Sequence, residues 1–205
     1  MKLNSKQLRD VDEAEAKSKL TSHTRNPLYL IVENVYDTYN VGGLFRLADA
    51  LNVSKVYLCG ETEIPPNHKI VKASIGTYKI VPWVYKATAA EAIEELRNKH
   101  IGIEARKVGG EKKLDESRIS TSNPSSIKIV AVEQAPGSVD YRKANYEAPV
   151  ALLVGNETSG VTEETLRLCD QIVEIPMWGI NKSLNVIVSA AIVGYLAAGA
   201  FTPES

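Results

Sequence analysis

Continuous apolar runs constrain the fold of this chain more than any other feature of its sequence. The runs are LYLIVENV (28–35), KVYLCG (55–60), YKIVPWVY (78–85), IKIVAVEQ (127–134), PVALLVG (149–155) and QIVEIPM (171–177). They are apolar almost throughout and do not alternate with polar residues, which is typical of strands buried on both faces of a parallel sheet. We therefore predict six strands in a mostly parallel sheet.

Segments with helical spacing separate these strands. The segments are 41–52, 88–100, 162–169 and 183–200. Thr88 and Glu91 form a capping-box pair, and Thr162 is placed as an N-cap residue. Strands that alternate with helices predict an α/β fold in which helices flank both faces of the sheet.

The run SLNVIVSAAIVGYLAAGA (183–200) has no charged residue, so it fits either a membrane span or a buried helix. Its length is at the lower limit for a span, it contains Asn185 and Ser189, and it is rich in Ala and Gly. It also follows a predicted strand and a loop, as the helix of an α/β unit does. We expect a buried helix, with Ser183 as its N-cap, packed between the sheet and a second subunit.

Composition narrows the class of protein. The chain has 205 residues and a net charge of -1, so any nucleic acid must be held by a local basic patch. The two cysteines and three histidines lack the spacing of a metal site, and we expect reduced, buried thiols and no metal. The N-terminus, MKLNSKQLRD, has no apolar signal-peptide core, which favours a cytoplasmic protein.

Two polar segments each fit more than one structural interpretation. Residues 1–26 carry mixed charge and fit a solvated helix, a mobile arm or a basic arm that contacts RNA. Residues 101–126 begin with a strand-like stretch and continue as a long polar loop. That loop is either mobile surface or a substrate contact through its cations. These cations are Arg106, Lys107, Lys112, Lys113 and Arg118.

Three sequence motifs contain candidate functional residues. In NVGGLFRLADALNV (40–53) two glycines and Arg46 open a helix, and an arginine so close to a helix N-terminus suggests an anionic partner. In LLVGNETSGV (152–161) a strand runs into Gly-Asn-Glu, either as an ordinary turn or as a ligand site with Glu157 making a buried contact. In IPMWGINKSLN (175–185) Asn185 needs a specific partner if it is buried.

Together these segments resemble the SpoU-type, TrmH-like RNA ribose 2′-O-methyltransferases of the SPOUT superfamily. The family patterns are matched in order by Asn40, Gly42 and Arg46; by Gly155, Glu157 and Gly160; and by Ile175-Pro176-Met177 followed by Ser183-Leu184-Asn185-Val186. The similarity runs from about residue 28 to 200, with further matches at 72–83 and 138–142. The 101–126 segment is longer than the usual family connection.

The resemblance implies a methyltransferase domain over 27–205 with a trefoil knot at about 150–195, and a homodimer without membrane contact. It implies S-adenosylmethionine as cofactor and RNA, either tRNA or rRNA, as partner. The implied cofactor-binding residues are Val132, Gly155, Asn156, Ile175, Met177, Ser183 and Leu184. The implied catalytic residues are Arg46, Asn40, Glu157 and Asn185.

The implied reaction is attack of a ribose 2′-hydroxyl on the methyl group of a sulfonium. Arg46 almost never gives up its proton, so we expect it to bind phosphate and stabilise the developing alkoxide. Asn40, Glu157 and Asn185 are expected to position Arg46, the loops and the ribose. The alternatives are a non-catalytic knotted protein that binds RNA or the cofactor, and a dinucleotide enzyme, which would need the GxGxxG pattern that this chain lacks.

Overall fold

A seven-stranded sheet forms the centre of the molecule in the computed structural model, which describes residues 4–12, 15–16, 18, 24–107 and 126–201. The strand order is β3-β2-β1-β6-β4-β7-β5, and every pairing is parallel. The strands are β1 (Asn26–Glu33), β2 (Val53–Cys59), β3 (Trp83–Lys86), β4 (Lys128–Val132), β5 (Val139–Asp140), β6 (Val150–Val154) and β7 (Gln171–Glu174). The predicted α/β class is confirmed, and β5 is an additional short strand.

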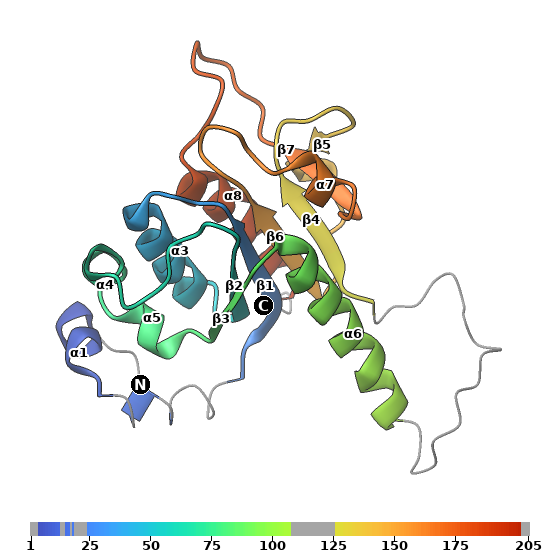
Figure 1. The fold of residues 1–205 in the computed structure, drawn as a ribbon. Coiled ribbons are helices and arrows are strands. Elements are labelled where there is room, and N and C mark those ends of the chain that lie inside the picture. The colour runs from blue at the N-terminus through green and yellow to red at the C-terminus, as the bar shows by residue number, and fades with distance from the viewer. Residues whose placement is uncertain (1–3, 13–14, 17, 19–23, 108–125, 202–205) are drawn as a thin grey trace.

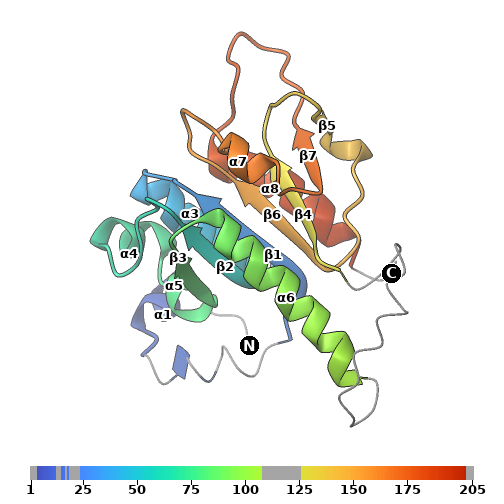
Figure 2. The same ribbon diagram turned by 45° about the vertical axis from the view of Figure 1, so that its right-hand side comes forward.

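Helices cover both faces of the sheet, as Figures 1 and 2 show. The helices are α1 (Ser5–Asp10), α3 (Thr38–Ala50), α4 (His68–Ser74), α5 (Thr77–Ile80), α6 (Ala89–Lys107), α7 (Glu163–Leu166) and α8 (Val186–Gly199), with a 3-10 turn at Tyr141–Lys143. Leu30 and Val32 of β1 pack with α3, α4 and α8, whereas Tyr29 and Ile31 pack with α6 and α7. The central strands β1, β4 and β6 are mostly apolar because both of their faces are buried.

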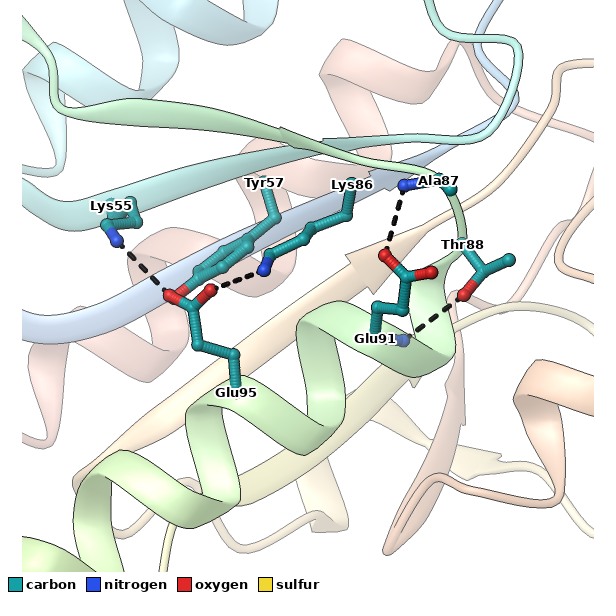
Figure 3. A network of polar contacts seen from close by, with 7 residues as sticks. All are labelled: Lys55, Tyr57, Lys86, Ala87, Thr88, Glu91 and Glu95. Carbon is teal, nitrogen blue, oxygen red and sulfur yellow. Dashed lines mark hydrogen bonds and ion pairs between the residues drawn. The ribbon is translucent and has the colours of Figure 1, made fainter.

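Helix α6 is fixed to the edge of the sheet by a polar network (Figure 3). The Glu95 carboxylate pairs with Lys86 of β3 at 2.7 Å and Lys55 of β2 at 3.3 Å, and it accepts the Tyr57 hydroxyl at 2.9 Å. The hydrogen bond from Lys86 is the main reason that the pKa of Glu95 is lowered to about 2. At the start of α6, the Thr88 hydroxyl accepts the Glu91 amide, as predicted, but the Glu91 carboxylate accepts the Ala87 amide and not that of Thr88.

Three predicted boundaries are wrong. Residues 77–80 form the helical turn α5, so the strand predicted over 78–85 begins only at Trp83. The strand-like stretch after residue 100 continues α6 to Lys107; Lys112, Lys113 and Arg118 lie outside the described residues. The N-cap of α8 is Asn185, whose side chain accepts the Ile187 amide, and not Ser183.

The start of α3 also differs from the prediction. The helix begins at Thr38 with Asp37 as its cap, so Gly42 and Gly43 lie within it and not in an anion-binding turn. A Cβ on Gly42 would lie 2.5 Å from the Cβ of Ala73 in α4, and one on Gly43 would lie 2.3 Å from Cδ1 of Ile187 in α8. Both glycines therefore allow α3 to pack closely against its neighbouring helices.

The remaining predictions about the chain have mixed outcomes. Cys59 is buried and Cys169 is partly buried, and both are free thiols. The described N-terminal residues include the capped helix α1, with Leu8 and Val11 buried. Among the described residues no helix is long and apolar enough to cross a membrane. The division at residue 26 and the knot at about 150–195 stay predictions.

Candidate active site

The loops that follow the carboxyl ends of the strands gather at one edge of the sheet, because all the strands are parallel. The chain runs from β1 outward to β2 and β3, while β6, β4 and β7 lie on the other side of β1. Such a reversal of strand order is where open α/β sheets bind ligands. Figure 1 shows the loop between β7 and α8 rising above this edge.

A cavity of about 250 Å³ opens at this edge among the loops after β4, β6 and β7. All seven residues predicted to bind a cofactor line it. These are Val132, Gly155, Asn156, Ile175, Met177, Ser183 and Leu184. Glu157 also lines the cavity, whereas Asn40, Arg46 and Asn185 do not.

Sequence reasoning missed three of the charged groups of this cavity. Glu133 and Glu174 line it with Lys182. The signal for both carboxylates was available, since Glu133 directly follows β4 and Glu174 is the last residue of β7. The walls thus combine apolar side chains with several carboxylates and one lysine, which suits a ligand that has an apolar ring and a positive charge.

The loop after β6 has a fixed shape. The backbones of Asn156 and Gly160 exchange hydrogen bonds of 3.1 and 2.9 Å. A Cβ on Gly155 would lie 2.4 Å from the carbonyl carbon of Gly160, so no other residue fits there. Gly160 itself has a φ of +70°, a conformation that glycine adopts without strain. The two glycines of the motif therefore shape the cavity wall.

Asn156 and Glu133 hold this loop against the sheet. Asn156 is buried; its Nδ2 donates to the carbonyl of Asn34 at 2.9 Å, and its Oδ1 accepts the amides of Thr158 and Ser159. The Glu133 carboxylate accepts the amide of Val161 at 2.9 Å. The Asn156 side chain is thus occupied within the protein, and it contributes to the cavity mainly as part of the wall.

Three of the four predicted catalytic residues form one hydrogen-bonded chain. The Asn40 side chain donates to Oε1 of Glu157 at 2.7 Å and accepts the side-chain amide of Asn185 at 2.9 Å. They come from α3, the loop after β6 and the cap of α8, 117 and 145 residues from Asn40 along the chain. Asn40 is the buried member; Glu157, expected to be buried, is exposed.

Arg46 stands apart from this chain. It lies in the third turn of α3 and is exposed. It makes no hydrogen bond or ion pair with any residue that the structure describes, so Asn40, Glu157 and Asn185 do not hold it directly. A guanidinium without a partner among the described residues is free to bind an external anion.

No metal site accompanies these residues in the described parts of the chain, where no three His, Cys, Asp or Glu side chains cluster to hold an ion. The polar side chains that line the cavity are instead amides, hydroxyls, carboxylates and the Lys182 ammonium. These groups can orient a ligand and stabilise charge.

Comparisons with known proteins match this geometry. The model of the SpoU rRNA Methylase family matches residues 27–125 and 116–195. A 23S rRNA (guanosine-2′-O-)-methyltransferase RlmB from Ralstonia nicotianae is 27% identical over 166 residues, which cover 81% of this chain and 56% of that protein. A tRNA (guanosine(18)-2′-O)-methyltransferase from Escherichia coli K12 is 27% identical over 173 residues, covering 83% of this chain and 62% of that protein.

Solved structures of methyltransferases are also similar to this chain. An AdoMet-bound rRNA methyltransferase from Sinorhizobium meliloti has a TM-score of 0.68 and 26% identity, covering 96% of this chain and 61% of that one. The SpoU methyltransferase AviRb from Streptomyces viridochromogenes, in complex with AdoMet, has a TM-score of 0.66 and 25% identity, covering 89% and 60%. The chain thus spans less than two thirds of these relatives. Since the family model matches most of it, this chain belongs to the SpoU rRNA Methylase family.

Proposed function

We propose that this protein transfers a methyl group from S-adenosylmethionine to a ribose 2′-hydroxyl of structured RNA, either tRNA or rRNA. One observation carries the proposal. The hydrogen-bonded chain of Asn40, Glu157 and Asn185 meets the cavity at Glu157, and Arg46, which has no ion pair with a described residue, lies on the same helix as Asn40. Relatives named as guanosine 2′-O-methyltransferases, and structural neighbours with AdoMet, support it.

The cavity fits the proposed cofactor by its chemistry. Val132, Ile175 and Leu184 give apolar surface for an adenine ring, and backbone groups of the same loops can meet its edge. The carboxylates of Glu133 and Glu174 give a negative environment. That environment complements a sulfonium and an amino group. When bound, S-adenosylmethionine supplies an electrophilic methyl group that a hydroxyl oxygen can attack.

The residues around the cavity then position and stabilise the attacking group. Arg46 stays protonated, binds a phosphate beside the target ribose, and stabilises the negative charge that develops on the 2′ oxygen as its proton leaves. Asn40 and Asn185 hold Glu157 in place. Of the four proposed catalytic residues, only Glu157 has a side chain that can accept a proton.

Methyl transfer from labelled S-adenosylmethionine to unmodified tRNA and rRNA tests the proposal. Incorporation that is lost when the target ribose lacks its 2′-hydroxyl supports it. Tight cofactor binding without any transfer would favour a non-catalytic binding protein instead. Calorimetric titration with S-adenosylmethionine and with NAD separates both from a dinucleotide enzyme. Mapping of 2′-O-methyl marks in RNA from cells without the gene identifies the nucleotide.

We further propose a homodimer located in the cytoplasm. Val188, Tyr195 and Leu196 on α8 are exposed, 45%, 59% and 41% respectively. Their spacing puts them on one face of the helix, so α8 carries an apolar stripe on the side away from the sheet. A second copy of the chain is the occupant we propose for it. Free cysteines are compatible with a reducing compartment.

A further inference from the structure

We infer that Tyr36 and Tyr39 form a stacking site for an unpaired nucleobase of the RNA substrate, next to the target ribose. The inference rests on the proposed function and names its substrate class: a nucleotide in a single-stranded loop or bulge, not one inside a duplex. The two tyrosines lie at the edge of the sheet that also holds the cavity. One precedes α3 and the other is in its first turn.

Both aromatic side chains are exposed where packing gives them no role. Tyr36 is 54% and Tyr39 51% exposed, and neither ring contacts another aromatic ring or a cation among the described residues. Tyr39 directly precedes Asn40, which is buried in the hydrogen-bonded chain with Glu157 and Asn185. A base stacked on Tyr39 would therefore lie near Glu157, the carboxylate that Asn40 positions.

Tyr36 is held in place before any ligand binds. Its hydroxyl donates to Oε2 of Glu61 at 2.6 Å. The loop around it is tied to the loop after β2, because the amide of Val35 donates to the Thr62 hydroxyl and Asn34 accepts the amide of Glu61. A ring that is already fixed loses little conformational entropy when a base stacks on it.

Cations that could bind the flanking phosphates lie on α3 and on the neighbouring helix α4. Arg46 is two helical turns from Tyr39 and so lies on the same face of α3. Lys69 and Lys72 are exposed on α4, which packs against α3 at Gly42. None of the three forms an ion pair within the described chain. Aromatic rings beside unpaired cations are the combination that binds single-stranded nucleic acid.

Duplex RNA fits this arrangement poorly. A base inside an A-form helix has both faces covered by its neighbours, so its stacking surface is not available to Tyr36 or Tyr39. An unpaired base exposes that surface, and its ribose can approach the cavity. The rings therefore select for RNA whose target region is single-stranded.

The test uses the full-length protein and a hairpin RNA with 2-aminopurine in its unpaired loop, with a fully paired duplex of the same sequence for comparison. The variants are Tyr36→Ala, Tyr39→Ala, Tyr39→Leu and Tyr39→Phe. We expect each alanine variant to bind the hairpin roughly 10-fold more weakly than the wild type and to lose the quenching of 2-aminopurine. Tyr39→Phe keeps the ring and should stay within about 2-fold of the wild type, while Tyr39→Leu should behave like alanine.

Controls separate stacking from folding and from the proposed function. S-adenosylmethionine affinity by calorimetry should be unchanged in all four variants. The melting temperature should be unchanged in the Tyr39 variants, whose ring is exposed, and slightly lower in Tyr36→Ala, which loses the hydrogen bond to Glu61. Wild-type hairpin affinity in Tyr39→Ala, or full rescue by leucine, overturns the stacking site while methyl transfer by the wild type stands. A wild type that neither binds nor methylates RNA overturns the proposed function, and the stacking site with it.

Discussion

Arg46 is exposed and has no protein partner among the described residues, although it shares α3 with the buried Asn40. A side chain placed to hold the fold would have polar contacts to lose on truncation, and Arg46 has no hydrogen bond or ion pair in the part of the chain that the structure describes. Its charge is therefore available for RNA. The prediction at this position concerns chemistry and not stability.

Arg46→Ala should reduce methyl transfer by about 10²- to 10³-fold, the usual effect of removing one group that stabilises transition-state charge. Single-turnover rates with labelled S-adenosylmethionine at saturating RNA measure it. Arg46→Lys keeps the charge but loses the planar fork, so it should recover only part of the rate. Cofactor affinity and the melting temperature should match the wild type. Near-normal turnover of the alanine variant would show that Arg46 has no role in the reaction.

Asn40 and Glu157 allow an exchange of donor and acceptor. Asn40→Asp removes the donated hydrogen bond and places a carboxylate against Glu157, which should destabilise the protein by about 1–3 kcal/mol. Adding Glu157→Gln restores a hydrogen bond between the two positions with its direction reversed, because the new glutamine amide can donate to the new aspartate. The aspartate can still accept the side-chain amide of Asn185. Urea unfolding should show recovery in the double variant.

The rate of the double variant then separates two roles of Glu157. If the carboxylate only holds Asn40 and Asn185, methyl transfer should return together with stability. If it accepts the 2′-hydroxyl proton, stability should return and the rate should stay low. A double variant less stable than Asn40→Asp alone would mean that the hydrogen bond does not position this part of the site.

At the level of elements, α6 is held to β2 and β3 by Glu95. Glu95→Gln should cost about 1 kcal/mol at pH 7, because partly exposed ion pairs contribute little each. The pKa of Glu95 is lowered from its ordinary 4.5 to about 2, so the carboxylate stabilises the fold above pH 4.5 and loses this effect as the pH falls toward 2. Urea unfolding of both proteins at pH 7 and pH 3 measures it.

The difference between Glu95→Gln and the wild type should therefore shrink from pH 7 to pH 3. Glu163→Gln is a matched control, since the ion pair of Glu163 among the described residues is with Arg167, one turn away and exposed. That variant should stay within about 0.5 kcal/mol of the wild type at either pH. A constant Glu95→Gln effect across this range would place its cause in packing and not in charge.

The elements that sequence predicted well are those whose pattern is set by burial. The strand cores of β1, β4 and β6 are apolar because both sheet faces are covered, and an uninterrupted run reports that directly. Helix starts depend on single side chains. Asp37 caps α3 ahead of Thr38 and Tyr39, which carry no apolar periodicity, and Asn185 caps α8 in preference to the nearby Ser183.

The candidate site also has a part that sequence predicted and a part that it did not. The resemblance to the SpoU-type enzymes identified the cavity lining, because its motifs fall on the loops after β6 and β7. The partner of each polar side chain was not predictable, since the Asn40 to Glu157 bond joins residues 117 apart. Only the strand order, which puts β6 beside β1, brings them together.

At the scale of the whole molecule, the net charge of -1 leaves no general attraction for RNA, so the position of groups matters more than their number. The described cations at the candidate RNA surface are few. A second copy of the chain would double this surface without changing its character. The apolar stripe on α8 is where we expect that copy to dock.

Tyr195→Glu should convert the proposed dimer to a monomer, because it would bury a charge in an apolar interface. Tyr195 is 59% exposed in the single chain, so the substitution should leave the monomer folded, with an unchanged circular dichroism spectrum. Light scattering after size exclusion measures the mass. Lys69→Glu, an exposed charge change on α4, is the control and should keep the mass of the wild type. A wild type that stays monomeric at high micromolar concentration would exclude the α8 stripe as a stable dimer interface.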